Sequence, residues 1–197
     1  MGHQFRTLAA RIYIYRVNFD DSRFIQVHHR NVWGEWTFVF DGIKLCGLRF
    51  QGGKTPSSLK ACAYAEPESE GKVRGRNAQV YQQARRELNL YLAGKIKKFT
   101  IPVKIYGTEF QTKVLEATRN IPYGETRTYK EIAEAIGHPH AERSVGNALH
   151  GNPLQVVVPC HRVVSSHKGI GGYALGTDLK RKLLCMENAI QNELDLE

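Results

Sequence analysis

Apolar and polar residues in the first part of the chain follow the two-residue period of β-strands. β-Branched and aromatic residues over 12–17 predict one strand, and the apolar runs 36–40 and 43–50 predict two more. Asp41-Gly42 separates the last two runs, and a glycine in this place is typical of a two-residue hairpin turn. Residues 51–78 contain paired glycines, prolines and mixed charges, which predict a long surface loop.

A helical period begins after this loop. Apolar residues recur at intervals of three and four over 80–92, which predicts an amphipathic helix that ends near Gly94. Strands followed by a helix indicate a small α+β domain. A lysine-rich stretch and a proline then mark a change in composition, so we place a boundary near residue 105, between domains 1–105 and 106–197.

Two capping boxes open helices in the second domain. Thr108 with Gln111 forms the first box, and Thr128 with Glu131 forms the second. Apolar residues at helical spacing follow each box, and Gly137 ends the second of these helices. The second domain is therefore predicted to be mostly helical.

The second capped helix has a close successor. A short helix is predicted over 141–150, so two helices are joined by a tight turn that contains glycine. This helix-turn-helix pattern is shared by DNA-binding modules and by ordinary packed helix pairs. A last helix is predicted over 178–190, where leucines and other apolar residues recur at helical spacing.

Composition is that of a globular protein. Of 197 residues, 42% are hydrophobic and 24% charged, which is enough apolar material for a core without metals or disulfides. No apolar run reaches the roughly 20 residues that cross a bilayer, and residues 1–11 lack the pattern of a signal peptide. We therefore expect an intracellular protein with no membrane partner.

The net charge of +9 suggests a polyanionic partner but does not establish one. All of the excess positive charge lies in residues 1–105, where clusters over 72–76, 85–86 and 95–98 are basic. A solvated basic face would have the same composition, so contact with nucleic acid and simple solvation both stay open.

Four scattered cysteines do not form a disulfide framework. Cys46, Cys62, Cys160 and Cys185 include no CxxC pair, and a reducing compartment is the default for such a chain. A bond between Cys46 and Cys62 stays open. His28 and His29 lack zinc-ligand spacing relative to these cysteines, so we expect no metal and no cofactor.

Cys160 differs from the other cysteines in its neighbours. The mostly apolar, β-branched run 155–158 predicts a buried strand that leads to it, and the glycine-rich residues 169–173 follow closely. A free thiol is mostly protonated at neutral pH, so a nucleophilic cysteine needs a base or nearby positive charge. His161 could supply the base and Arg162 the charge, whereas inert packing is the alternative interpretation.

Residues 152–164 read NPLQVVVPCHRVV and resemble the active-site signature of the O6-alkylguanine-DNA alkyltransferases, or methylated-DNA–protein-cysteine methyltransferases. The resemblance extends over residues 106–190. It includes several separate motifs in the same order, namely IPYGET at 121–126, TY at 128–129, RSVGNA at 143–148, GGY at 171–173 and Glu187.

This resemblance implies an α+β two-domain fold. The N-terminal α/β domain would be ribonuclease-H-like, and the mostly helical C-terminal domain would carry a winged-helix-like helix-turn-helix. It also implies a single-turnover DNA repair protein that takes an alkyl group from O6-alkylguanine onto Cys160 as an irreversible thioether. We expect a monomer, cytoplasmic in a prokaryote and nuclear in a eukaryote, acting on double-stranded DNA that carries the lesion.

The resemblance assigns the chemical roles. His161, oriented by Glu187, would take the proton of Cys160 through a water molecule, and Tyr129 would donate a proton to the flipped guanine. Tyr129 also lies on the apolar face of its helix, so a hydroxyl bonded to backbone is its alternative role. Asn152 would tie the helix-turn-helix to the reactive turn. The pocket would also involve Pro159, Val163, Tyr173 and Ala174.

The resemblance also implies that the second helix of the helix-turn-helix makes the DNA contacts, and that it would enter the minor groove while the damaged nucleotide rotates out of the stack. Arg143 would fill the gap that the extruded base leaves, and an ion pair with Glu142 is its alternative role. Ser144, Gly146 and Ala148 are small enough to approach a groove floor, with Asn147 between them.

Two positions depart from the commonest family pattern. Glu142 replaces a small residue beside the expected DNA surface, although a carboxylate is also favoured at a helix N-terminus. Gln155 stands where some members carry a proline that walls the pocket, which bears on sensitivity to bulky inhibitors such as O6-benzylguanine.

Three other functions are weighed against repair. A protein of the same fold that binds alkylated bases without repairing them usually has tryptophan in place of the cysteine, so Cys160 argues against it. A transcription regulator would use the helix-turn-helix alone. A cysteine hydrolase is disfavoured because the adjacent Cys160 and His161 would tend to point apart and no acyl-transfer motif surrounds them.

Overall fold

The computed structural model describes residues 24–50, 75–166 and 169–190. The predicted strand at 12–17 lies outside the described residues, and so does most of the predicted loop 51–78. The last residues of that loop are an exception, because they already belong to a helix, α1 (Gly75–Leu92). The predicted end of the loop was therefore wrong by several residues.

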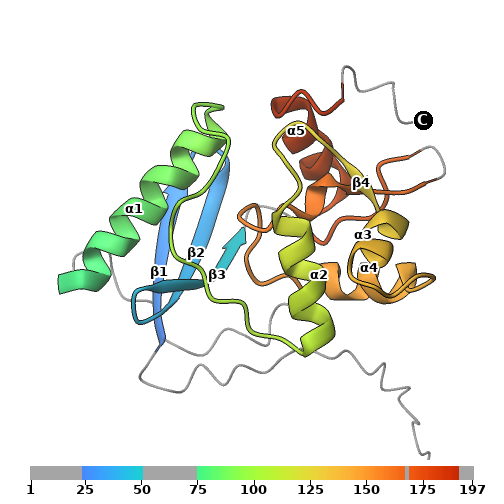
Figure 1. The fold of residues 1–197 in the computed structure, drawn as a ribbon. Coiled ribbons are helices and arrows are strands. Elements are labelled where there is room, and N and C mark those ends of the chain that lie inside the picture. The colour runs from blue at the N-terminus through green and yellow to red at the C-terminus, as the bar shows by residue number, and fades with distance from the viewer. Residues whose placement is uncertain (1–23, 51–74, 167–168, 191–197) are drawn as a thin grey trace, which may run out of the picture.

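A three-stranded antiparallel sheet forms the first half of the fold (Figure 1). Its strands are β1 (Phe24–Asn31), β2 (Gly34–Asp41) and β3 (Lys44–Phe50), in that spatial order. Sequence analysis missed β1, because its many polar residues obscure the strand pattern even though Val27 is buried. The hairpin between β2 and β3 is confirmed, but Asp41 pairs with Lys44, so its turn is Gly42-Ile43, one residue later than predicted.

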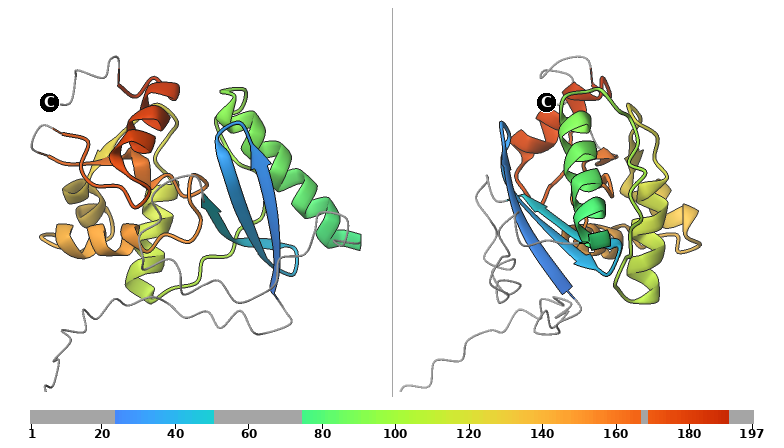
Figure 2. Two further views of the ribbon diagram at one scale, coloured as in Figure 1. Left: turned by 180° about the vertical axis from the view of Figure 1, so that it is seen from behind. Right: turned by 90° about the vertical axis from the view of Figure 1, so that its left-hand side faces the viewer.

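Helix α1 lies against this sheet, as both views in Figure 2 show. Its periodic apolar face is confirmed, because Leu88 and Tyr91 are buried. The ring of Tyr81 meets the rings of Phe38 and Phe40 edge-on, at centroid distances of 5.6 and 6.4 Å. These aromatic contacts fix the helix on the face of the sheet that carries Phe38 and Phe40.

The second half is mostly helical, as predicted. It contains α2 (Glu109–Arg119), α3 (Tyr129–Ala135), α4 (Glu142–His150) and α5 (Thr177–Met186). Strands β4 (Arg127–Thr128) and β5 (Val163–Val164) form a short parallel pair, and Cys160–Arg162 form one turn of 3-10 helix, η3.

The predicted helix boundaries in this half are mostly confirmed. Both capping boxes are present at α2 and α3, and Gly137 has a positive φ of 74° just after α3. The last helix is shorter than predicted. It ends at Met186, and Asn188 with φ of 55° prevents its continuation toward Ile190.

The run 155–158 is buried but is not a strand, which corrects the sequence-based prediction. It is a tight turn, in which the amide of Val158 donates to the carbonyl of Leu154 at 2.8 Å. Val156 occupies the left-handed region with φ of 71°, a costly conformation for a β-branched residue. Extended pairing along this run is therefore replaced by a bend.

Contacts with β3 hold this turn in place. The amide of Leu48 donates to Pro153 at 2.8 Å, and the amide of Gln155 donates to Leu48 at 2.9 Å. The side chain of Gln155 is buried, and its Oε1 accepts from the amide of Phe50 at 2.7 Å. The first half of the chain thus holds the segment that leads directly to Cys160.

Buried apolar residues from both halves join in one hydrophobic cluster. Leu88 and Tyr91 on α1 belong to it together with Val114 on α2 and Val158 beside Cys160. Among the described residues, no helix combines the length and apolar character that spanning a membrane requires.

Candidate active site

Cys160 lies at the start of η3, directly after the tight turn. Its side chain is only 7% exposed, and its sulfur lines a cavity of about 240 Å³. Other lining residues come from α3, α4 and the segment before α5, and they are Tyr129, Gly146, Leu149, His150, Gly172, Tyr173 and Ala174. Of the three cysteines that the structure describes, only Cys160 borders this cavity.

Asn152 holds the cysteine in position. Its Nδ2 donates to the carbonyl of Val158 at 2.9 Å and to Sγ of Cys160 at 3.1 Å. Its Oδ1 accepts from the amide of Leu154 at 3.0 Å, and its own amide donates to Leu149 on α4 at 3.1 Å. One buried side chain therefore connects the end of α4 to the reactive turn.

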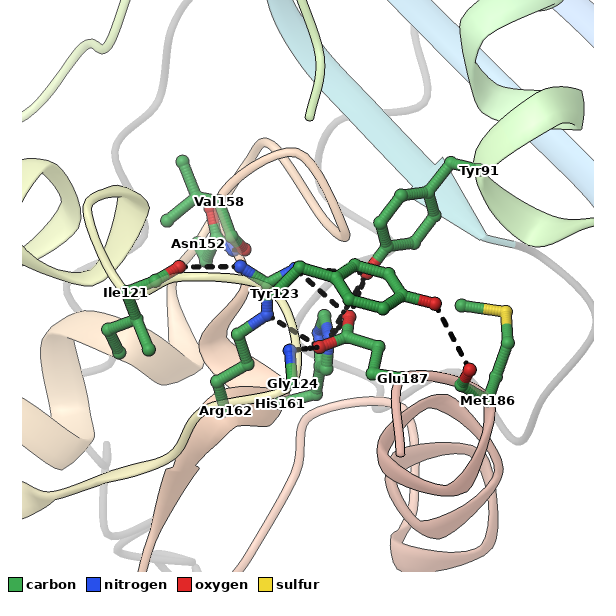
Figure 3. Close-up of polar contacts among 10 residues, drawn as sticks. All are labelled: Tyr91, Ile121, Tyr123, Gly124, Asn152, Val158, His161, Arg162, Met186 and Glu187. Carbon is green, nitrogen blue, oxygen red and sulfur yellow. Dashed lines mark hydrogen bonds and ion pairs between the residues drawn. The ribbon is translucent and has the colours of Figure 1, made fainter. Parts of the chain in front are cut away.

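His161 and Glu187 meet in the interior, away from solvent (Figure 3). His161 Nε2 lies 2.7 Å from Oε1 of Glu187, and both side chains are fully buried. This contact assigns the imidazole proton to Nε2, which leaves Nδ1 as a lone pair. Nδ1 is buried and has no hydrogen-bond partner among the described residues, so it is available to accept a proton.

Arg162 points toward Glu187 and not toward the thiol. Its Nε donates to Oε2 of Glu187 at 2.7 Å, and its Nη1 donates to the carbonyl of Ile121 at 2.6 Å. The guanidinium also lies over the ring of Tyr123, 5.7 Å from the centroid. The expectation that Arg162 supplies positive charge at Cys160 is therefore wrong, because its charge compensates a buried carboxylate.

The protonation states follow from this burial. Burial lowers the pKa of His161 more than the hydrogen bond with Glu187 raises it, so the imidazole is neutral at pH 7. Burial also raises the pKa of Cys160, and the hydrogen bond from Asn152 and the charge of Lys180 only partly oppose this. The resting site thus pairs a neutral thiol with a neutral base.

Lys180 is a site residue that sequence analysis missed. It is fully buried, and its Nζ donates to the carbonyl of Val163 at 2.6 Å and to that of Gly172 at 3.2 Å. Burial lowers its pKa to about 8. A lysine inside a helical sequence predicts a solvated side chain, so nothing in the local pattern distinguishes this one.

The cavity wall combines an aromatic ring with close backbone. The hydroxyl of Tyr129 donates to the carbonyl of Gly172 at 3.4 Å, and its ring is half-buried. Gly171 has φ of 69°, and a Cβ there would lie 3.3 Å from the amide of Ser165. Glycine is therefore needed for the segment to bend beside Tyr129.

Tyr173 and Ala174 border the cavity, whereas Pro159 and Val163 are buried and do not line it. The hydroxyl of Tyr173 is buried close to the sulfur of Cys160 but lacks a well-aligned hydrogen bond with any described residue. Val163 is buried in the core and pairs with Arg127 across the short parallel sheet. Gln155 is bonded to β3 and does not line the cavity.

Only some of the residues of α4 that were predicted to contact DNA are exposed. Arg143, Ser144 and Asn147 are exposed, and Gly146 is half-buried beside the ring of Tyr129. Ala148 is 3% exposed and packs in the core, so its predicted place at a groove floor is wrong. The helical period brings it onto the same inward face as Val145 and Leu149.

The two charged residues at the start of α4 do not pair with each other. Arg143 makes no ion pair with Glu142 or any other residue in the described ranges, so the alternative role for Arg143 lacks support. Glu142 occupies the first turn of α4, where a carboxylate complements the helix dipole.

The chain is similar in sequence to a set of named proteins. The profile described as "6-O-methylguanine DNA methyltransferase, DNA binding domain" matches residues 109–189. A methylated-DNA–protein-cysteine methyltransferase of Methanosarcina acetivorans is 47% identical over 113 residues, which cover 57% of this chain and 72% of that protein. The inducible methylated-DNA–protein-cysteine methyltransferase of Bacillus subtilis is 35% identical over 162 residues, covering 82% and 90% respectively.

Solved structures extend this similarity to the fold. The O6-methylguanine methyltransferase of Mycobacterium tuberculosis matches with a TM-score of 0.69 and 34% identity, covering 88% of this chain and 97% of that one. The structure of Mycobacterium tuberculosis OGT in complex with DNA matches with a TM-score of 0.68 and 33% identity, covering 83% and 92%. The chain therefore shares an α+β fold with these proteins over most of its length.

The buried carboxylate makes stability depend on pH in acid. Burial opposes ionisation of Glu187, but hydrogen bonds from His161 and Arg162 prevail and lower its pKa from 4.5 to about 2. Its contribution is thus fully present above about pH 4.5 and is lost as the pH falls toward 2. We expect the stability advantage of the wild type over Glu187→Gln to shrink by on the order of 3 kcal/mol across this range.

Urea unfolding of both proteins at several pH values measures this difference, and the other carboxylates cancel because both variants contain them. An advantage of the wild type that stays constant from pH 6 to pH 2.5 would contradict the assignment of Glu187 as a buried carboxylate.

Proposed function

This chain belongs to the methylated-DNA–protein-cysteine methyltransferase family and repairs DNA by alkyl transfer, and we propose that Cys160 is the residue that accepts the alkyl group. The observation that carries this proposal is the position of its sulfur. Cys160 borders the same cavity as Tyr129, and the next residue, His161, belongs to a buried hydrogen-bonded pair with Glu187.

The transfer is an in-line displacement at the alkyl carbon. The thiol proton passes through a water molecule to Nδ1 of His161, the sulfur forms a bond to carbon, and the bond from carbon to O6 breaks. The electron pair of that bond stays on the purine, which takes a proton from the hydroxyl of Tyr129 and leaves as neutral guanine. Solvent then returns the proton held by His161 to Tyr129.

The thiol of Cys160 is neutral at rest, and this determines when its proton must leave. Because burial raises the pKa of Cys160, a standing thiolate is not the nucleophile, and the proton must leave as the alkyl group approaches. The free Nδ1 of His161 suits it to this task, and Glu187 stabilises the imidazolium that forms. The positive charge of Lys180 favours the developing thiolate.

Tyr129 is suited to the second proton transfer. Its hydroxyl lies at the cavity wall, and the long contact of 3.4 Å with Gly172 is weak enough to exchange for a bond to the purine. Burial raises the pKa of Tyr129, so the hydroxyl keeps its proton until a strongly basic leaving group arrives.

The cavity requires a flipped nucleotide, because the O6 edge of a stacked guanine is inaccessible to a buried thiol. We propose that α4 enters the minor groove of double-stranded DNA and that Arg143 occupies the space vacated by the base. The exposure of Arg143, Ser144 and Asn147 on one side of the helix supports this arrangement. Ala148 is excluded from the DNA surface by its burial.

The product is a thioether, which the site has no means to cleave, so each molecule acts once. We propose that it works as a monomer inside the cell, in the cytoplasm of a prokaryote or the nucleus of a eukaryote. We further propose the division into domains 1–105 and 106–197, the first ribonuclease-H-like and the second with a winged-helix-like helix-turn-helix. The match of the family profile to residues 109–189 supports this boundary.

Mass mapping after reaction tests the acceptor. The protein is incubated with a duplex oligonucleotide containing one O6-methylguanine and then digested. We expect one methyl group on the peptide that contains Cys160, a stoichiometry of one per molecule, and no transfer by Cys160→Ala. Cys185→Ala is the matched control and should react as the wild type does. Tight binding to the lesion with unchanged mass would instead indicate a protein that senses damage without repairing it.

A second variant tests the role of Arg143. We expect Arg143→Ala to lose on the order of 100-fold in the transfer rate on duplex DNA, because unstacking a base costs a few kcal/mol that the inserted side chain offsets. The rate with free O6-benzylguanine should stay within about threefold of wild type, since no duplex must then be opened. Arg119→Ala removes another exposed arginine as a control. Equal losses on duplex and free base would refute the assignment.

A further inference from the structure

A tyrosine from the first half of the chain reaches the buried pair behind the reactive cysteine. Tyr91 lies near the end of α1, about seventy residues before His161, and it is 1% exposed. Its hydroxyl donates a hydrogen bond to Oε1 of Glu187 and lies 3.4 Å from Nε2 of His161 (Figure 3).

Oε1 of Glu187 is shared among three donors. It accepts from the hydroxyl of Tyr91, from Nε2 of His161 at 2.7 Å and from Nη2 of Arg162 at 3.1 Å. The other oxygen, Oε2, accepts from Nε of Arg162 at 2.7 Å. His161 and Tyr91 therefore draw on the negative charge of the same oxygen atom.

We propose that Tyr91 is a positioning residue that sets the basicity of His161 by competing with it for the charge of Glu187. This inference rests on the proposed role of His161 as the base for Cys160. A donor that shares the carboxylate oxygen reduces the charge available to stabilise an imidazolium. The hydroxyl thereby keeps His161 neutral near physiological pH and ready to accept the thiol proton.

A phenol is well suited to this role. A second carboxylate at this position would add negative charge beside Glu187, and a lysine would add a second positive charge beside Arg162. A phenol donates a hydrogen bond to the carboxylate without changing the net charge. Burial raises the pKa of Tyr91 far above its ordinary range, so the phenol remains a donor across the working pH of the protein.

Every element packed around His161 contributes to its charge environment. Glu187 attracts a proton to the ring, and the cations Arg162 and Lys180 oppose that. The ring of Tyr173 meets the imidazole edge-on at a centroid distance of 6.3 Å, and Cys160, which carries the thiol, directly precedes His161 in the chain. Tyr91 is the member of this set that comes from α1, so the first half of the chain completes the active site.

The pH dependence of Cys160 reactivity tests the proposal without DNA. The rate of carbamidomethylation by iodoacetamide is followed at Cys160 by peptide mass from pH 4 to pH 9 in the full chain. Tyr91→Phe removes the hydroxyl and keeps the ring. Because more carboxylate charge then falls on His161, its pKa rises, and we expect the acidic limb of the rate profile to move up by about one pH unit.

The rate on the plateau should change by less than about threefold, since the base is fully deprotonated there. Tyr81→Phe is the matched control, because it removes a phenol hydroxyl from the same helix at a buried position that contacts Phe38 and Phe40. We expect its acidic limb to coincide with that of the wild type. A uniform loss at all pH values in Tyr91→Phe, no shift, or an equal shift in Tyr81→Phe would overturn the proposal.

A second probe serves if Tyr91→Phe does not fold. Site-specific 3-fluorotyrosine at position 91 keeps the hydrogen bond and makes the phenol a stronger donor, so the acidic limb should move to lower pH. A limb that stays in place or moves upward would overturn the proposal. These outcomes are independent of whether Cys160 accepts alkyl groups from DNA, so a failure here leaves the mass-mapping result on repair unaffected.

Discussion

A buried negative charge organises this protein. The carboxylate of Glu187 lies in the interior, where an uncompensated charge would cost several kcal/mol, so the fold must surround it with donors. Three separate parts of the chain supply them: Tyr91 on α1, Gly124 in the loop before β4, and His161 and Arg162 on η3. Satisfying one carboxylate therefore brings together elements that are distant in sequence.

The same requirement gives the site its chemistry. Glu187 fixes the imidazole proton on Nε2 and leaves Nδ1 unprotonated, while burial keeps both the ring and the thiol of Cys160 neutral at rest. A protonated thiol reacts slowly with stray electrophiles, which suits a nucleophile that is used once. In the proposed mechanism, reactivity depends on a bound lesion that brings an alkyl carbon into the cavity, where Tyr129 already lies.

Local sequence signals predicted the parts of this fold that local chemistry decides. The capping boxes at Thr108 and Thr128, the glycine stop at Gly137 and the motif around Cys160 each depend on residues only a few positions apart. Tertiary contacts decide the rest. Residues 155–158 have the composition of a strand, but hydrogen bonds with Leu48 and Phe50 hold them in a turn.

The missed site residues have the same explanation. Lys180 and Tyr91 follow patterns typical of a solvated lysine and a core aromatic, and only their partners from other elements reveal that both belong to the site. Ala148 was wrongly placed at the DNA surface because small size alone does not indicate which face of a helix is exposed. The side chain of Arg162 points toward Glu187, a residue that is distant in sequence, so nothing in the local sequence indicates this contact.

The state of His161 in the free protein tests this account most directly. In ¹⁵N spectra of histidine-labelled protein, compared with His161→Gln for assignment, the account predicts a neutral ring at pH 7 with its proton on Nε2 and a bare Nδ1. An imidazolium at pH 7, or a neutral ring protonated on Nδ1, would contradict the claim that Glu187 holds His161 as the base for Cys160.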